Sequence, residues 1–129
     1  MLKYKKSEAK EYAQECLRGI FAASMTPFNV DGSTDELGLR SNLNHWVGDL
    51  GIDGLFINGK QGEFFSMTLD ERKRQFEIVL DEVGGSCRTI MSCSDENLET
   101  VMELGRYAQN IGADWIIVHA PPLYFHTNV

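Results

Sequence analysis

The sequence predicts an α/β fold in which parallel strands alternate with helices. Short apolar runs of the length of a buried strand recur along the chain, and amphipathic stretches with helical spacing lie between them. The runs are nearly continuous in apolar residues, which is typical of parallel strands covered on both faces. Four such strand–helix units are about half of a (β/α)8 TIM barrel, which needs roughly eight. The predicted fold is therefore the first half of a TIM barrel, preceded by an N-terminal helix.

The first expected elements are a helix over residues 7–18, with Ser7 as its N-cap, and a strand over residues 20–25. Because the helix precedes the strand, it can cover the amino-terminal end of a barrel. The expected domain division is an N-terminal helical extension over residues 1–18 and the barrel half over residues 19–129.

Capping signals mark the starts of the later helices. Ser33-Thr-Asp-Glu36 and Thr68-Leu-Asp-Glu71 both read as capping boxes. The first opens a helix that ends at Gly51, and the second opens a helix over residues 69–83. A polar turn at residues 94–97 leads into a further helix. The apolar residues expected to face inward on that helix are Leu98, Val101, Met102, Leu104, Ala108 and Ile111.

A strand is expected over residues 89–93, and a weak internal repeat predicts the next one. Residues 112–119 repeat the pattern of residues 51–58: a Gly that ends a helix, an Asp, and a buried strand that ends in a polar residue. The repeat predicts that Asn58 and His119 occupy equivalent positions near strand ends. A single such His is more often a structural residue than a ligand, although it can face a site.

A polar turn follows the expected strand at residues 55–57. Gly59 and Gly62 enclose Lys60 and Gln61 in this turn. A strand, a Gly-rich turn and a helix form the unit from which α/β folds build ligand sites, because the turn lies at the carboxyl end of its strand. Glycine lets backbone N–H groups approach a bound anion closely. The turn is therefore a candidate substrate-binding site.

Four stretches, taken in order, resemble the dihydrodipicolinate synthase/N-acetylneuraminate lyase family, the pyruvate-dependent class I aldolases. They are Met25-Thr-Pro-Phe28, the signature Gly59-Lys-Gln-Gly-Glu63, Thr68-Leu-Asp-Glu-Arg72 and Pro121-Pro-Leu-Tyr124. The resemblance runs from about Gly19 to the end of the chain and covers the first half of a family member. We therefore expect a fragment or truncated product, or a chain whose missing strands a partner supplies.

The resemblance implies a Schiff-base lysine that attacks pyruvate or a related 2-oxo acid, a tyrosine that shuttles protons, and a loop that holds the carboxylate. Tyr124 matches the catalytic tyrosine. Residues 59–62 would hold the substrate, and Thr26 and Glu63 would support them. The family's Schiff-base lysine belongs to a later strand, beyond Val129. Without the resemblance, Tyr124 would read as a core or interface aromatic.

The signature departs from the family pattern at its centre. The family usually has two threonines between the glycines, where this chain has Lys60 and Gln61. The backbone donors can survive this change, whereas a hydroxyl relay is lost. Lys60 adds a cation and suggests a different or more acidic substrate. A desolvated lysine can also attack a carbonyl itself, but loop lysines usually stay solvated.

The composition excludes several classes of function. A net charge of −7 over 129 residues argues against binding to nucleic acid or to an anionic membrane. No apolar stretch has the length of a membrane span, and no signal-peptide core is present, so we expect a cytoplasmic protein. Cys16, Cys87 and Cys93 are irregularly spaced and read as reduced thiols. We expect neither a cofactor nor a metal ion.

Two functional hypotheses remain, and a third is disfavoured. The first is a lyase acting on a 2-oxo acid through a Schiff base, with the resemblance implying a homo-oligomer of the tetramer-of-dimers type. The alternative is a non-catalytic, degenerate half-barrel that acts as an assembly partner, either as a homodimer or with a full-length relative. A metal-dependent aldolase on the same fold is disfavoured because no metal ligands cluster in the sequence.

Overall fold

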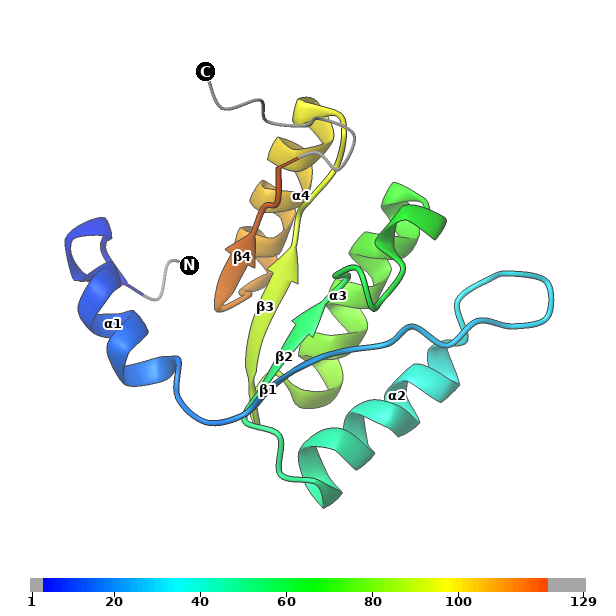
Figure 1. Ribbon diagram of the computed structural model, residues 1–129, viewed down its shortest axis with the longest axis horizontal. Helices are drawn as coiled ribbons and strands as arrows, with labels where there is room; N and C mark the ends of the chain where they lie inside the picture. Colours follow the sequence, from blue (N-terminus) through cyan, green and yellow to red (C-terminus); the bar gives the residue numbers. More distant parts are fainter. Residues whose placement is uncertain (1–3, 121–129) are drawn as a thin grey trace.

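The computed structural model describes residues 4–120 and contains one parallel sheet of four strands in the order β1-β2-β3-β4 (Figure 1). Each strand pairs with its successor along the chain, all in parallel. The strands are β1 (Phe21–Ala23), β2 (Gly54–Ile57), β3 (Arg88–Ser92) and β4 (Trp115–Ile117). This arrangement confirms the predicted α/β fold of parallel strand–helix units.

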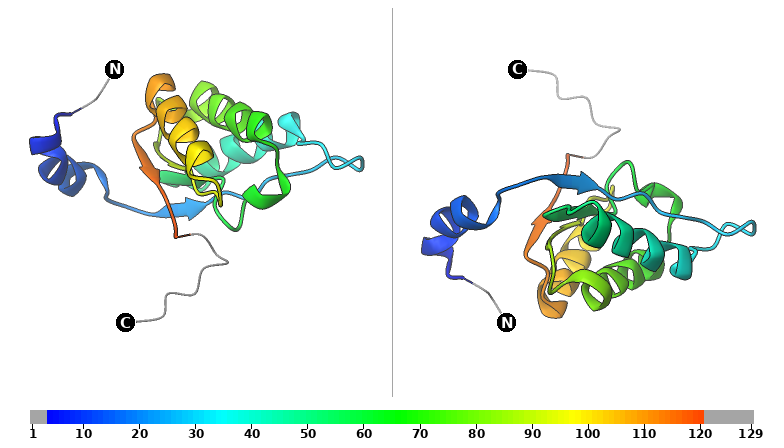
Figure 2. Two further views of the ribbon diagram at one scale, coloured as in Figure 1. Left: turned by 90° about the horizontal axis from the view of Figure 1, so that it is seen from above. Right: turned by 90° about the horizontal axis from the view of Figure 1, so that it is seen from below.

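Helices precede and separate the strands. They are α1 (Ala9–Cys16), α2 (Glu36–Asn44), α3 (Leu69–Val83) and α4 (Leu98–Ile111), with shorter helical turns η1 (Lys6–Glu8), η2 (His45–Asp49) and η3 (Phe64–Ser66). Figure 2 shows α2, α3 and α4 on one face of the sheet, with no helix packed over the opposite face. Among the described residues the helices thus cover one face of the sheet, and cover on the other face stays a prediction for the complete barrel. Among these residues, no helix has the length and apolar character needed to cross a membrane.

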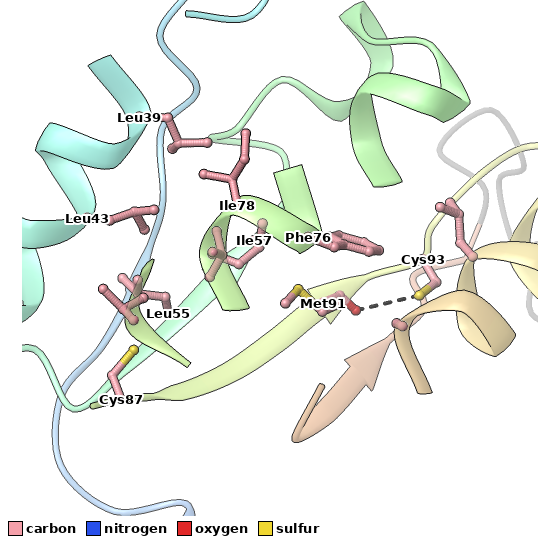
Figure 3. Packing of buried hydrophobic residues seen from close by; sticks show 13 residues of the cluster. Leu39, Leu43, Leu55, Ile57, Phe76, Ile78, Cys87, Met91 and Cys93 are labelled. Carbon is pink, nitrogen blue, oxygen red and sulfur yellow. Dashed lines mark hydrogen bonds between the residues drawn. The ribbon is translucent and has the colours of Figure 1, made fainter. Parts of the chain in front are cut away.

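The hydrophobic core lies between the sheet and these three helices (Figure 3). Its buried aliphatic and aromatic members are Leu39, Leu43, Leu55, Ile57, Phe76, Ile78, Val79, Val83, Met91, Leu104 and Ala108. Cys87 and Cys93 belong to the same core as free thiols. Burial raises the pKa of each to about 11, so both thiols stay protonated at neutral pH.

Local capping chemistry explains where two of the helices begin. Helix α3 begins and ends where the sequence predicted, and its capping box is confirmed: the Thr68 hydroxyl accepts from Glu71 N and the Glu71 carboxylate accepts from Thr68 N. The predicted box at Ser33 is wrong. Ser33 N donates to the Asp31 carboxylate at 3.0 Å in a preceding turn, and Asp35 caps α2 instead.

Two further expectations fail for physical reasons. Ser7 lies inside the turn η1 and does not cap the helix that follows. On α4, Leu98 and Met102 are 73% and 47% exposed. The helix packs against the core mainly through its carboxyl-terminal half, where Leu104 and Ala108 are fully buried, so its first turns lie outside that contact.

The internal repeat has a structural basis in two aspartates. The Asp53 carboxylate, just before β2, accepts from Ile20 N at 2.8 Å. The Asp114 carboxylate, just before β4, accepts from the Thr89 backbone N at 2.9 Å. Each aspartate therefore holds the amino end of the neighbouring earlier strand. Gly19 leaves room for this contact, because a Cβ at its φ of +91° would lie 2.1 Å from the Asp53 carboxylate.

Helix α1 meets the sheet at the end opposite the strand tips. The Tyr12 ring lies 5.7 Å from the ring of Trp115, the first residue of β4. The Tyr4 ring stacks on that of Tyr12, with the ring centroids 4.6 Å apart. The N-terminal helix therefore lies beside the amino end of the sheet, as the sequence suggested.

Candidate functional site

The loops that follow β2, β3 and β4 enclose a cavity of about 370 Å³ at the carboxyl end of the sheet. The arrows of these strands point toward this end in Figure 1. The lining residues are Lys60, Phe64, Phe65, Ser94, Asp95, His119 and Ala120. Barrel enzymes place their reacting groups in this layer, so the cavity is the candidate site.

The Gly59–Gly62 turn leaves β2 through two overlapping bends. Gly62 N donates to Gly59 O and Glu63 N donates to Lys60 O, each at 3.1 Å. Asn58 and Glu63 flank the turn in the left-handed conformation, with φ of 55° and 56°. The backbone N–H groups of Lys60 and Gln61 have no acceptor among residues 4–120. These two donors are therefore available to a bound anion.

Thr26 fixes this turn to the end of the first strand. Its hydroxyl donates to Gly62 O at 2.7 Å and accepts from the Gln75 amide at 3.2 Å. Gly62 is buried, and a Cβ there would lie 3.0 Å from the backbone oxygen of Ser24. The supporting position proposed for Thr26 thus has a direct contact, and Gln75 is a partner that the sequence did not indicate.

The other predicted site residues contribute unequally to the cavity. Lys60 lines it with an exposed side chain, whereas Gln61 is exposed and lies outside the lining. Glu63 contributes its left-handed backbone, and its carboxylate has no partner among the described residues. The structure therefore brings Lys60 together with His119 and with the loop after β3. Tyr124 lies outside the described residues.

A buried arginine that sequence reasoning missed organises the floor of the cavity. Arg72 is 2% exposed, and its guanidinium forms an ion pair with Asp95 at 3.0 Å. It also donates to Ser94 O at 2.8 Å and lies 5.1 Å from the Phe64 ring centroid. Burial lowers the pKa of Arg72 and the Asp95 carboxylate opposes this, so the group remains a cation.

The sequence did contain a signal for Arg72. It lies on α3 between Leu69 and Phe76 at helical spacing, so a charged residue occupies the inward stripe. A charged residue at such a place needs a buried counter-charge, and the counter-charge comes from the next loop. Asn58 completes the connection because its amide donates to Arg72 O at 3.1 Å.

A short chain of hydroxyl groups connects the ends of β3 and β4. Ser92 Oγ donates to Ser94 Oγ at 3.2 Å. His119 contacts the same oxygen twice, through its backbone N at 2.9 Å and its ring Nδ1 at 3.0 Å. Asn58 and His119 both follow strand ends, but Asn58 is fully buried while His119 faces the cavity.

The consecutive parallel strand–helix units and the loop-lined cavity at the strand tips place the chain in a fold class, that of the (β/α)8 barrels and their halves. Within that class, the chain belongs to the Dihydrodipicolinate synthetase family, which matches residues 16–129.

Curated relatives are identical to this chain at about a third of the aligned positions. An N-acetylneuraminate lyase from Fusobacterium nucleatum is 36% identical over 108 residues, which are 84% of this chain and 37% of the relative. A 4-hydroxy-tetrahydrodipicolinate synthase from Methanothermobacter thermautotrophicus is 37% identical over 105 residues, 81% of this chain and 37% of the relative. The chain thus spans well under half the length of these proteins.

Solved structures share the same arrangement. The N-acetylneuraminate lyase from Fusobacterium nucleatum superposes with a TM-score of 0.80 at 35% identity, over 85% of this chain and 38% of that one. A prophage protein of the dihydrodipicolinic acid synthase family from E. coli K12, in complex with pyruvate, superposes with a TM-score of 0.78 at 30% identity. The match covers 84% of this chain and 36% of that one. These overlaps confirm the TIM-barrel prediction for the first strand–helix units.

Proposed function

We propose that the chain supplies the amino-terminal half of a lyase that makes or breaks a carbon–carbon bond to pyruvate or a related 2-oxo acid through a Schiff base. The observation that carries the proposal is the pair of N–H groups at Lys60 and Gln61, which have no acceptor among residues 4–120 and belong to a turn beside the strand-tip cavity. Relatives of this family have been crystallised with pyruvate, which carries the carboxylate that such donors bind.

Each part of the proposed site has a distinct task. The backbone of residues 59–62 holds the carboxylate, supported by Thr26 and Glu63, while Lys60 adds a cation that favours an acidic substrate. Tyr124 shuttles protons, and the Schiff-base lysine comes from a strand beyond residue 129. The proposal includes the division at residues 1–18 and 19–129, a homo-oligomeric state, and action in the cytoplasm.

Borohydride trapping tests the assignment of the lysine. Residues 1–129 are joined to the remaining carboxyl-terminal segment of the Fusobacterium nucleatum relative and incubated with pyruvate and borohydride. We expect mass spectrometry to find the reduced adduct on a lysine of the added segment, and none on residues 1–129 alone.

A Lys60→Met variant of this chimera is the matched control and should still form the adduct. An adduct on Lys60 would overturn the assignment of the lysine. A correctly folded chimera that traps nothing would overturn the lyase proposal.

The assembly role is a second candidate because one sheet face is open. Phe56, Ile90 and Trp115 are paired in register across β2, β3 and β4, so their side chains share a face, opposite Leu55 and Met91. They are only partly buried, and the one helix contact described on this face is that of Tyr12 on α1 with Trp115 at its edge (Figure 2). A second copy, related by a two-fold axis through the barrel centre, could place its β1 beside β4 and close eight strands.

Sedimentation velocity on the 129-residue chain tests this assembly. We expect a dimer whose population falls for Ile90→Glu, because the new charge would be buried inside the closed barrel. Val30→Glu is the control, since Val30 lies fully exposed on the loop before α2. A monomer at every concentration, or equal effects of the two substitutions, would rule the closed dimer out.

A further inference from the structure

The hydrogen bonds around Ser94 determine which ring nitrogen of His119 carries the proton. Ser94 Oγ accepts from His119 N at 2.9 Å, and Ser92 Oγ lies 3.2 Å from it. The buried Ser92 hydroxyl has no other acceptor among the described residues, so it donates to Ser94 Oγ. A serine hydroxyl has two lone pairs and one proton, so both lone pairs are occupied. Its proton is then left for His119 Nδ1, 3.0 Å away. The Nδ1 atom is therefore an acceptor, and the neutral ring carries its proton on Nε2.

The Nε2–H group ends the chain of hydrogen bonds that runs from Ser92 through Ser94 to the His119 ring. No residue among those described accepts from it, and the His119 ring lines the cavity together with Phe64 and Phe65. The Phe56 ring lies 6.1 Å away, and Ser92 and Ser94 are buried behind the imidazole. An oriented N–H donor thus faces the cavity beside two phenylalanine rings, and the cavity is also lined by Lys60 and Asp95.

We propose that His119 contacts the ligand directly, with Nε2–H donating to a hydroxyl or carbonyl oxygen, and that Ser94 and Ser92 are positioning residues that hold its tautomer. This inference rests on the proposed function and deepens it: the partner of the 2-oxo acid presents a hydroxyl or carbonyl oxygen to the cavity wall at His119. An apolar aldehyde would leave Nε2–H unpaired in the cavity, which sites of this kind discriminate against.

NMR of the chain labelled with 15N-histidine tests the positioning. The chain has three histidines, and His119→Gln identifies the signals of interest by their loss. We expect a single Nε2-protonated ring at a pH where the imidazole is neutral. Ser94→Ala should give a mixture of tautomers, and Ser92→Ala should move the ring partly toward Nδ1–H, because it frees a lone pair on Ser94.

Ser41→Ala, at an exposed serine on α2, is the matched control and should leave the ring unchanged. The amide spectrum shows that each variant is folded. A ring protonated on Nδ1 in the wild-type chain, or a ring that Ser94→Ala leaves unaltered, would overturn the proposal.

The ligand contact is tested with mannosamine as the probe and cyclohexylamine, which keeps the ring and the ammonium but lacks hydroxyls, as the control. We expect mannosamine alone to shift the Nε2 resonance. His119→Phe should weaken mannosamine binding about tenfold, equivalent to about 1.4 kcal/mol, while His119→Gln restores part of it through its amide donor.

An unmoved Nε2 resonance, or equal mannosamine affinity in His119→Phe, would refute the contact. The outcome is independent of borohydride trapping. An adduct with an unmoved Nε2 leaves the lyase proposal standing without this inference, whereas a shifted Nε2 with no adduct keeps His119 as a sugar-binding residue and removes the lyase.

Discussion

Asp95→Ala is expected to destabilise the chain by about 3 kcal/mol, because it leaves a buried cation without its counter-charge. The Arg72 side chain is 2% exposed and that of Asp95 is 28% exposed, so removing the aspartate isolates the more deeply buried partner. This loss of unfolding free energy lies at the lower end of the range for removing one partner of a buried ion pair. The reason is that Arg72 keeps its hydrogen bonds to the backbone oxygens of Ser92 and Ser94. Urea denaturation followed by circular dichroism measures the change in unfolding free energy.

Two further variants show whether charge or packing is responsible. Asp95→Asn keeps an acceptor oxygen and should lose less than half as much stability. Arg72→Met removes the cation and keeps much of the volume, so adding Asp95→Ala to it should have little further effect. If Asp95→Ala changed stability by less than about 0.5 kcal/mol, the ion pair would not be the main support of the cavity floor.

Asp114→Ala is expected to have an effect of similar size, about 3 kcal/mol, at the other end of the sheet. It removes the acceptor for both the backbone N and the hydroxyl of Thr89, at 2.9 and 3.1 Å, and leaves a buried N–H unpaired. Asp114 itself is buried, 6% exposed, so water does not replace the lost acceptor easily. The same denaturation experiment gives the difference.

The internal repeat provides the matched control. Asp53 makes the equivalent contact to Ile20 N, but both residues are exposed. Asp53→Ala should therefore lose only about 1 kcal/mol, because solvent can satisfy the freed N–H. Equal effects at the two positions would show that burial does not determine the strength of this contact.

The sequence predicted those parts of the structure that local signals determine. Helix α3 was predicted with its bounds because Thr68 and Glu71 are three residues apart at its start and form a capping box. The start of α2 was missed because the turn through Asp31 competes for Ser33, and Asp35 is left as the cap. The capping box predicted at Thr68 thus formed, whereas the similar one predicted at Ser33 did not.

The candidate site was predictable only where it lies next to the signature turn. Residues 59–62 were identified from their glycines, and the structure places the turn at the cavity. The contacts of Arg72 with Asp95 and of Ser94 with His119 join residues more than twenty positions apart. Such pairs depend on strand register, in which Ile90 lies opposite Trp115, and no local pattern encodes it.

The order of the strands has a consequence for how the polypeptide is made. Because every strand pairs with its immediate successor, the pairing partner of each new segment has already left the ribosome when that segment emerges. The chain can therefore add one strand and one helix at a time at a single growing edge.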